Sequence, residues 1–505
     1  MNKRSGANRW LALVVLGLAQ LMDVLDSTIV AIALPTIQHD LGLPADHRQW
    51  LMTGYALAFG SLLLLGGRLA DYFGRKRVFL IGVGGFAVAS AVGGAAGDFT
   101  TLLVARVGQG AFAAMLAPAA LSLLSITFAD DAEERGRAFG IFGAISGAGG
   151  AVGLLLGGVL TQGLSWRWCL YVNLVIAAVA FVGGLRLLHD GDRPRRVRLD
   201  IKGTLAVVLG LVGIVFGLGT AEANGWHDVR TLGPVAAGVV LIAVFVVVER
   251  RTAHPLLPLR VVLDRVRGAA YLTLGIAGIG MFAVLLFLTY YLENTLGFTP
   301  VQTGLAFLPM IGLVMAGAVF SGAVLLPRTG PRPLVPVGCL LAAVGMVVLT
   351  GIGAGSTYGV DVLPALLVTG VGFGFIFGPV QNAATSGVRP HDAGVASALV
   401  TTAQQIGGSI GMAVFSSLTT TAVASYLAAR PATAAQPVTI AEATFAGYHL
   451  VFRVAAAVFL SSAVLAALLF RSGPLPVDAG HAADHDPLVP QSPATTADHD
   501  KERTA

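Results

Sequence analysis

Long apolar stretches, separated by short polar segments, follow one another along almost the whole chain of 505 residues. A helix needs about 20 predominantly apolar residues to cross a bilayer, with a range of about 17–25. The stretches of this length lie at residues 11–37, 50–70, 78–97, 101–127, 136–160, 167–188, 203–222, 232–249, 268–292, 302–325, 333–353, 361–386, 393–427 and 449–470. The pattern therefore predicts an all-α integral membrane protein with 14 transmembrane helices.

The positive charges between these stretches indicate how the chain is oriented. An even number of spans places both termini on one side, and cytoplasmic loops are enriched in Lys and Arg. With the N-terminus inside, the cytoplasmic loops contain Arg75, Lys76, Arg77, the segment 193–202, Arg250, Arg251, Arg260, Arg265, Arg267, Arg328, Arg332 and Arg389. The opposite loops contain only Arg48, Arg167, Arg230 and Arg430. We therefore expect a multi-pass protein of the cytoplasmic (inner) cell membrane with both termini in the cytoplasm.

Composition supports the membrane assignment and excludes several function classes. Hydrophobic residues make up 55% of the chain and charged residues 12%, against about 25% charged in soluble domains. Cys169 and Cys339 lie far apart in apolar runs, without a thiol or histidine at metal-ligand spacing, so we expect two core residues and no metal site. The sequence has no nucleotide-binding GxxxxGK motif and no clustered basic patch. We expect no cofactor, no nucleic-acid partner and no enzyme activity.

A short motif occurs twice, at half-chain spacing. The loop after the second span reads GGRLADYFGRKRVFL, and the loop after the tenth reads GAVLLPRTGPRPLV. Setting Gly74 against Gly330 also aligns Lys76 with Arg332, although the second copy has lost the acidic residue. Such a repeat is typical of transporters built from two parallel bundles related by an axis along the membrane normal.

The repeat predicts a division of the chain into two pseudo-symmetric six-helix bundles. We expect the N-terminal bundle at residues 1–190 and the C-terminal bundle at residues 265–471. Spans 7 and 8 then form an inserted transmembrane hairpin, with its cytoplasmic linkers, at residues 191–264. Residues 472–505 are rich in Pro, Asp, His and Ala and have too little apolar content to bury a core, which predicts a disordered cytoplasmic tail.

The first copy of the repeated loop resembles the loop 2–3 signature of the major facilitator superfamily. The segment GRLADYFGRKRV, Gly67–Val78, matches the pattern Gly-x-x-x-Asp-x-x-Gly-Arg-Lys. The resemblance implies a gating motif made of Gly67, Asp71, Gly74, Arg75 and Lys76. In that family the acid faces the start of span 13, which His391 and Asp392 precede here, and latches the cytoplasmic gate in one state. A solvated pair between Asp71 and Arg75, four residues apart, is the alternative.

Further stretches resemble the fourteen-span drug/proton antiporter branch of that superfamily. LDSTIVAIALP (25–35) is similar to its first-span motif, with Ala31 where Asn is usual, and LLVARVGQGAFAA (102–114) resembles its fourth-span motif. WRWCLYVN (166–173) and TTAQQIGGSIGMAV (401–414) match in the same way. The WRW residues sit at the predicted outer surface, where an aromatic belt is the simplest interpretation.

The run GGAVGLLLGGVL (149–160) resembles the branch's fifth-span antiporter motif, which implies a site at Gly149, Gly153, Gly157 and Gly158. Glycines four residues apart also let helices pack closely, and packing alone would explain them. Leu154 stands where that motif has proline. Because helix kinks usually trace to proline, the substitution leaves open whether the chain is an antiporter or another facilitator.

Two acids and one arginine are predicted to lie deep in the membrane. Counted at about 1.5 Å per residue from residue 11, Asp26 lies about 22 Å from the inner surface. Arg106 enters its span from the outside and reaches a similar depth in a bilayer of about 30 Å. We therefore predict that Asp26 and Arg106 are neighbours in the N-terminal bundle.

These charges are candidates for proton coupling, because a carboxylate at mid-bilayer costs about 2.5–3.5 kcal/mol and is usually functional. Protonation of Asp26 would loosen its pair with Arg106; a static ion pair is the alternative. Asp23 lies one turn before Asp26 on nearly the same face. Two acids there suit a proton carrier or the counter-ion of a cationic substrate, whereas the simpler interpretation has Asp23 hydrogen-bonded within the bundle.

The C-terminal half supplies candidates for a substrate cavity: Tyr290, Tyr291, Phe377, Gln381 and Asn382. The alternative is that most of these side chains face lipid. An apolar cavity with few polar groups suits lipophilic compounds. Glu293 adds an acid near the outer end of span 9, at a depth that favours a rim position.

Together these features predict a monomeric, proton-coupled efflux antiporter that exports lipophilic small molecules or drugs, cationic ones among them, by alternating access. Its partners would be the substrate, protons as coupling ion and the lipid bilayer, with Na⁺ as the other candidate ion. The alternatives are a dedicated exporter of one endogenous metabolite, such as an antibiotic or siderophore, and a facilitator without antiport.

Overall fold

The computed structural model describes residues 6–128, 132–189, 200–252, 257, 259–388 and 393–473. Within them, 14 helices are long and apolar enough to span a membrane, which confirms the predicted all-α, fourteen-span fold. These helices are α1 (Gly6–Asp40), α2 (Ala45–Phe73), α3 (Arg75–Gly94), α4 (Phe99–Thr127), α5 (Ala132–Gly163), α6 (Trp168–Leu187), α7 (Ile201–Asn224), α8 (Val229–Arg251), α10 (Arg265–Asn294), α11 (Pro300–Val319), α13 (Pro331–Leu349), α14 (Leu363–Thr385), α15 (Ala393–Ala428) and α16 (Pro437–Leu469).

Short elements complete these spans. The π-helical turn η1 (Phe320–Leu325) and helix α12 (Leu326–Thr329) continue α11, and the π-helical turn η2 (Tyr358–Val362) leads into α14. Helix α9 (Leu259–Val262) precedes α10. Of the predicted tail, residues 474–505 lie outside the described part of the chain.

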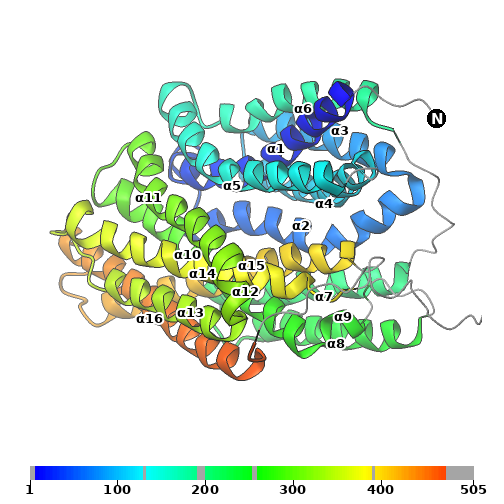
Figure 1. The fold of residues 1–505 in the computed structure, drawn as a ribbon. Helices are drawn as coiled ribbons and strands as arrows, with labels where there is room; N and C mark the ends of the chain where they lie inside the picture. Colours follow the sequence, from blue (N-terminus) through cyan, green and yellow to red (C-terminus); the bar gives the residue numbers. More distant parts are fainter. Residues whose placement is uncertain are drawn as a thin grey trace, which may run out of the picture.

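The helices run side by side in two groups (Figure 1). Helices α1 to α6 pack mainly on one another, with α2 and α3 on α4 and α1 on α5. Helices α10, α11 and α13 to α16 form the other group, with α10 on α15 and α13 on α14. The groups, called the N-bundle and the C-bundle below, meet along two seams, α2 on α15 and α5 on α11.

Helices α7 and α8 form a hairpin that lies on the first of these seams. The two helices pack on each other, and α7 also contacts both α2 and α15. The ring of Trp50 on α2 packs against Gly219 of α7, where a side chain would collide with it. The centre of this ring lies 5.9 Å from the ring centre of Phe216, also on α7. Much of α8 faces outward with apolar side chains, including Val239, Val240 and Val244. The inserted hairpin therefore bridges the bundles and faces lipid with its second helix.

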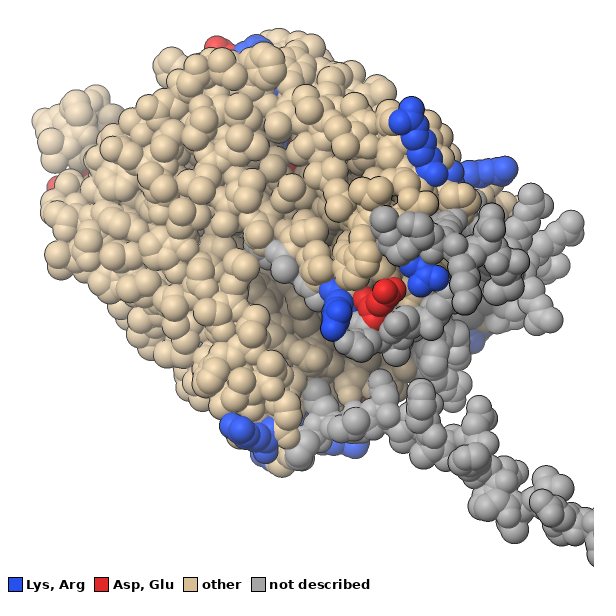
Figure 2. Space-filling view, turned by 45° about the horizontal axis from the view of Figure 1, so that its top comes forward, with Lys and Arg blue, Asp and Glu red and all other residues tan. Residues whose placement is uncertain are grey.

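Charged residues are sparse on the molecular surface, as a membrane-embedded protein requires. On the face shown in Figure 2, most of the surface carries neither Lys and Arg nor Asp and Glu. This agrees with a charged fraction of only 12%.

The two copies of the repeated loop share a backbone geometry. Gly74 separates α2 from α3 with φ of 99°, and Gly330 separates α12 from α13 with φ of 73°. Both angles lie in the left-handed region that favours glycine. Lys76 Nζ then donates to the carbonyl of Leu185 near the end of α6 (2.7 Å), and Arg332 Nε donates to the carbonyl of Ala467 near the end of α16 (3.1 Å).

These two cations therefore perform the same task in each bundle. The last carbonyls of a helix lack partners within that helix and carry partial negative charge, which a cation stabilises. In each bundle, the helix that follows the loop is thereby fixed to the bundle's last helix.

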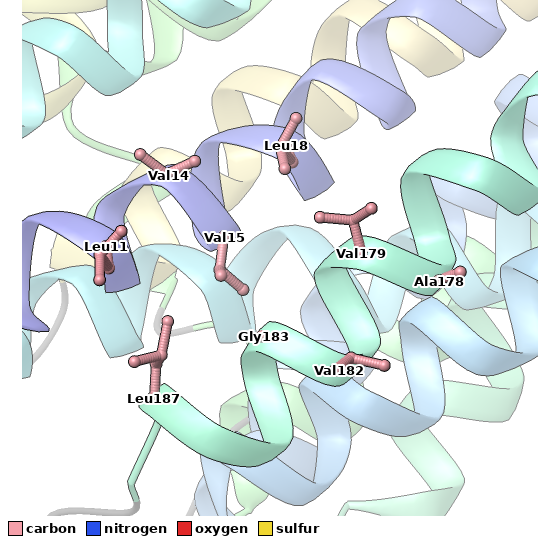
Figure 3. Close-up of a pocket in the computed structure, with 9 residues that line it drawn as sticks. All are labelled: Leu11, Val14, Val15, Leu18, Ala178, Val179, Val182, Gly183 and Leu187. Carbon is pink, nitrogen blue, oxygen red and sulfur yellow. The ribbon is translucent and has the colours of Figure 1, made fainter.

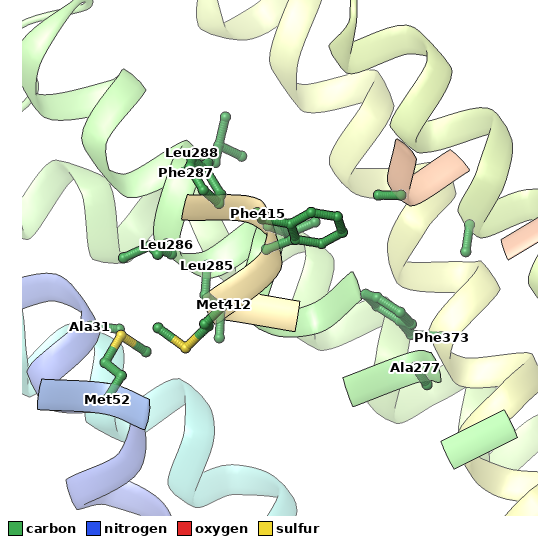
Figure 4. Packing of buried hydrophobic residues seen from close by; sticks show 14 of the residues in the cluster. Ala31, Met52, Ala277, Leu285, Leu286, Phe287, Leu288, Phe373, Met412 and Phe415 are labelled. Atoms are coloured by element: carbon green, nitrogen blue, oxygen red, sulfur yellow. The ribbon is translucent and has the colours of Figure 1, made fainter. Parts of the chain in front are cut away.

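Buried apolar side chains fill the contact between the bundles. Ala31 of α1, Met52 of α2, Leu286 of α10 and Met412 of α15 belong to one core cluster, in which the two methionine side chains point toward each other (Figure 4). Methionine is flexible and adapts to different packing partners, so this contact between the bundles can tolerate changes in packing. Cys169 and Cys339 are buried, as predicted.

Glycine lets α2 and α4 approach closely. A Cβ atom on Gly110 would lie 2.4 Å from the carbonyl oxygen of Tyr55, whereas a Cβ on Gly108 would make an ordinary contact of 3.5 Å with Ala89. Small residues at such crossings support helix packing in membranes.

We predict that Gly110→Ala lowers the free energy of unfolding by about 1–3 kcal/mol, because overpacking forces the helix backbones apart. The matched variant Gly108→Ala should leave stability unchanged or slightly raised. Equilibrium unfolding in mixed detergent–SDS micelles measures both, and equal stabilities would contradict the close approach of α2 and α4.

Candidate functional site

The N-bundle contains a buried ion pair between α1 and α4. Arg106 Nη1 donates to Asp26 Oδ2, and the two side chains are 1% and 0% exposed. The structure thus brings together the two residues whose depths in the membrane match. Their role in proton coupling stays a prediction.

Three more polar residues complete the surroundings of Asp26. Its Oδ1 accepts from Gln109 Nε2 (2.9 Å) and from Asn173 Nδ2 of α6 (2.7 Å). Gln109 also donates to Ser90 of α3 (2.8 Å) and accepts from Arg106 (2.9 Å). The carboxylate therefore receives donors on both oxygens, from α4 and α6.

Sequence reasoning missed these three residues, although a signal was present. Gln109 follows Arg106 by three residues and so lies on the same side of α4. Asn173 ends the stretch WRWCLYVN, and Ser90 is one of the few polar residues in its span. A polar side chain inside an apolar span needs a partner. Asp26 is that partner for Gln109 and Asn173, and both of these amides also donate to Ser90.

Asp23 occupies a neighbouring environment. The hydroxyl of Tyr55 on α2 donates to Asp23 Oδ1 (2.6 Å). The guanidinium of Arg106 lies over the ring of Tyr55, 4.5 Å from its centre, and its Nε donates to the carbonyl of Leu51 (3.1 Å). Arg106 is thus in contact with Asp26 and with the tyrosine that binds Asp23.

The gating motif lies where α2 meets α3. Asp71 Oδ1 and Arg75 Nη2 form an ion pair of 3.6 Å within the chain turn, and both side chains are partly exposed. Gly67 lies against Pro118 of α4, and Gly74 and Lys76 have the roles given above. His391 and Asp392 lie outside the described residues, so the latch at the start of span 13 stays a prediction.

The antiporter-motif glycines face two different helices. Cβ atoms on Gly149, Gly153 and Gly157 would meet Val24, the carbonyl of Leu25 and the carbonyl of Ile29, all on α1. Three of the four glycines thus allow α5 to pack within the N-bundle.

The fourth glycine faces the C-bundle. A Cβ on Gly158 would lie 2.6 Å from the carbonyl oxygen of Pro300 on α11. Leu154, in the place of the usual proline, is fully buried, and its carbonyl oxygen would lie 2.6 Å from a Cβ on Gly304. Helix α5 remains continuous from Ala132 to Gly163 through this position.

The five predicted cavity residues do not lie together. Tyr271, near the start of α10, donates to the carbonyl of Ala384 at the end of α14 (3.1 Å), so the two helices are antiparallel. Tyr290 is 19 residues further along α10, or about 28 Å away.

The five candidates therefore fall into two groups along the C-bundle, and their role in a substrate cavity stays a prediction. Tyr290 and Tyr291 lie at one end of the C-bundle, whereas Gln381 and Asn382 lie exposed near the other. Tyr291 donates to the carbonyl of Gly353 (2.9 Å). Phe377 stacks on Phe373 of the same helix.

Tyr290 instead joins the two bundles. Its hydroxyl donates to Gln38 Oε1 at the end of α1 (2.7 Å), and the guanidinium of Arg48 on α2 lies 4.1 Å from its ring centre. Glu293, three residues further, is half-buried at the same end of α10, as a rim position requires. These contacts and the contact between Gly158 and Pro300 close the molecule at this end.

The WRW segment (residues 166–168) is bonded to the end of α1 and is not a simple aromatic belt. Trp166 is only 2% exposed, and its Nε1 donates to Asp40 Oδ2 (2.8 Å). Arg167 donates to the same oxygen (2.7 Å) and to the carbonyl of Ala96 (3.2 Å). Trp168 alone, at 47% exposed, has the environment of a belt residue.

A groove on the surface of the N-bundle is entirely apolar. It runs between α1 and α6 (Figure 3) and is lined by Leu11, Val14, Val15, Leu18, Ala178, Val179, Val182, Gly183 and Leu187. Leu11 and Val14 are about half exposed. None of the predicted site residues line it, and its composition matches a surface in contact with lipid chains.

The chain shares its sequence pattern with known transporters. The sequence model of the Major Facilitator Superfamily matches residues 16–412. The puromycin resistance protein pur8 of Streptomyces alboniger is 47% identical over 485 residues, which cover 96% of this chain and 95% of that relative. The tetracenomycin C resistance and export protein of Streptomyces glaucescens is 36% identical over 406 residues, covering 80% and 75%.

A solved structure shows a similar fold. The bacterial homologue of the human lysosomal transporter Spinster, in an inward-facing and unoccupied conformation, superposes with a TM-score of 0.64. The match covers 92% of this chain and 98% of that protein at 15% identity.

The ion pair generates a prediction about stability. Arg106→Met leaves the charge of Asp26 buried without its cation, so we expect the free energy of unfolding to fall by about 3–5 kcal/mol. In the double variant Asp26→Asn/Arg106→Met the loss should be smaller than the sum of the two single losses. Equilibrium unfolding of all four proteins measures this coupling, and additive losses would contradict a stabilising pair.

The contact of Tyr290 with Gln38 predicts a change in access. Tyr290→Phe removes one hydrogen bond between the bundles, worth about 0.5–1.5 kcal/mol, so the closed end should open about 2- to 10-fold more often. The measurement is the rate at which Ala31→Cys reacts with a membrane-impermeant maleimide, since the native cysteines are buried. Tyr291→Phe is the control because that hydroxyl bonds within the C-bundle, and a faster reaction in both variants would contradict the assignment.

Proposed function

Because the chain belongs to the major facilitator superfamily of membrane transporters, we propose that it is a proton-coupled antiporter that exports lipophilic small molecules or drugs, cationic ones among them. Export proceeds by alternating access, in which the two bundles rock about a site near the middle of the membrane. The observation that carries the proposal is the fully buried pair of Asp26 and Arg106 with Asp23 beside it.

The names of the relatives support drugs as the substrate class. The relatives are described as resistance proteins for puromycin and lincomycin, as an export protein for cephamycin, and as a multidrug resistance protein of Mycobacterium tuberculosis. The first of them aligns with nearly the whole of both chains, so puromycin is the first compound to test.

The proposed orientation follows the positive charges, with both termini in the cytoplasm. The end where Tyr290 meets Gln38 is then the outer end, and the structure has its outer side closed. Inward proton flow would drive export, because protonation of the acidic pair changes the relative free energies of the inward-open and outward-open states. The protein acts as a monomer in the inner membrane.

A second candidate is a dedicated exporter of one endogenous metabolite. It is supported by relatives described as exporters of single antibiotics, among them the tetracenomycin C resistance and export protein and the probable actinorhodin transporter of Streptomyces coelicolor. A third candidate, a facilitator without antiport, rests on Leu154 alone.

The test uses inverted membrane vesicles that contain the full chain and carry a proton gradient. We expect that puromycin or ethidium dissipates the gradient, and that Asp26→Asn reduces this flux by about tenfold or more, since the variant leaves Arg106 without its charged partner. A fluorescent pH indicator follows the gradient.

Vesicles without the protein provide the background. Dissipation by one compound only would favour the dedicated exporter, and export from cells without proton movement would favour the facilitator. An unchanged proton flux in Asp26→Asn would contradict a role in transport for the buried pair of Asp26 and Arg106.

A further inference from the structure

The two carboxyl groups of α1 are held in different ways. Asp26 is fully buried and receives donors from Arg106, Gln109 and Asn173. Asp23 is 6% exposed, and among the described residues it receives one hydrogen bond, from the hydroxyl of Tyr55. Within the described part of the chain, α1 therefore carries one acid with hydrogen bonds to both oxygens and one with a hydrogen bond to Oδ1.

This difference decides which acid can gain a proton at lower cost. A proton on Asp26 would leave the buried cation of Arg106 without its counter-ion, and uncompensated buried charge is expensive. It would also disturb donors from two helices, α4 and α6. Hydrogen bonds to the ionised form of an acid favour that form. The site around Asp26 is therefore built for a permanent carboxylate.

Asp23 meets no such obstacle. A neutral carboxyl carries the proton on one oxygen and keeps a carbonyl oxygen that still accepts from Tyr55. The hydrogen bond of 2.6 Å to Tyr55 thus survives in both protonation states. Asp23 is also the more accessible of the two acids, at 6% exposed against 0% for Asp26.

We propose that Asp23 is the carboxyl that binds and releases the transported proton, that Tyr55 positions it, and that Asp26 stays ionised as the fixed counter-ion of Arg106. The inference rests on the proposed function, since it assigns the proton of that antiporter to one of its two acids. The step is a simple protonation: Asp23 gains a proton on one side of the membrane and loses it on the other.

The surroundings of Asp23 connect it to the seam between the bundles. The ionisable groups around it are Asp26 on its own helix, Tyr55 on α2 and Arg106 on α4. Helix α5 faces this part of α1 with Gly149 and Gly153.

Helix α2 connects Asp23 to the C-bundle. It presents Tyr55 to Asp23, and one and a half turns later the carbonyl of Gly60 accepts from Thr402 of α15 in the C-bundle (3.1 Å). A change of charge on Asp23 therefore acts on the helix that packs against the other bundle.

The test compares two reactions of the purified full chain in proteoliposomes, with radiolabelled puromycin as the probe. Exchange of labelled for unlabelled puromycin needs no net proton movement, whereas uptake against a gradient driven by pH does. In Asp23→Asn we expect exchange within about twofold of wild type and pH-driven uptake reduced by about tenfold or more. In Asp26→Asn we expect both reactions to fall by about tenfold or more.

The opposite pattern overturns the assignment: Asp26→Asn that keeps exchange and loses driven uptake, with driven uptake intact in Asp23→Asn. Wild-type exchange without pH-driven uptake would instead refute the proton coupling of the proposed function. Absence of wild-type exchange with both puromycin and ethidium would refute its substrate class. Both of these results are obtained with the wild-type protein. They are therefore distinguishable from a failure of the proton assignment, which only the variants can show.

The pH dependence of transport in Tyr55→Phe tests whether Tyr55 positions Asp23. A purely structural role of Tyr55 would leave this pH dependence unchanged. Tyr55 donates to both forms of Asp23, but the bond to the carboxylate is the stronger one. Without the hydroxyl, the ionised form of Asp23 is therefore less favoured relative to the protonated form. The low-pH limb of the transport profile should then move up by about one pH unit. Tyr171→Phe is the control, because Tyr171 lies on α6 and packs on Trp168. Its pH profile of transport should equal that of the wild type. An unmoved profile in Tyr55→Phe overturns the positioning role, even if Asp23→Asn fails to fold.

Discussion

The low dielectric of the membrane interior is the constraint on which the N-bundle is built. A charge there must be paired and hydrogen-bonded, or it must be removed. Asp26 and Arg106 satisfy this rule with Gln109 and Asn173, and the network joins α1, α4 and α6. The arrangement fixes three helices of the bundle relative to one another, so the same residues that carry charge also define how the bundle packs.

The contacts between the bundles are of a different kind. Along α5 and α11 they are close backbone approaches at Gly158 and Gly304, and between α10 and α1 a single tyrosine hydroxyl makes the polar contact. Such contacts are specific but individually weak, because each can be lost without leaving a charge buried. A buried charge network within one bundle and weaker contacts between the bundles are what the proposed alternating access would require.

The sequence alone predicted the spans and the depth of the buried charges, because both follow from residue counts along single helices. Matching depths were enough to pair Asp26 with Arg106. The partners Gln109, Asn173 and Tyr55 could not be assigned in the same way, since they come from other helices whose rotation about their axes the sequence does not give. The separation of Tyr290 from Gln381 has a related cause: the sequence grouped them by residue type, whereas their positions along antiparallel helices place them far apart. The aromatic-belt interpretation of Trp166 failed because Asp40, more than a hundred residues away, lies beside it.

The hairpin of α7 and α8 makes the two seams of the molecule unequal. Helix α7 packs on both α2 and α15, so it lies between that seam and the lipid. Any rotation of one bundle against the other must slide at least one of these surfaces past α7, and the ring of Trp50 seated at Gly219 is one of the contacts that would have to give. In the proposed alternating access, the hairpin would therefore resist movement at the seam between α2 and α15, whereas the seam between α5 and α11 has no such cover among the described helices, so the two seams would open unequally.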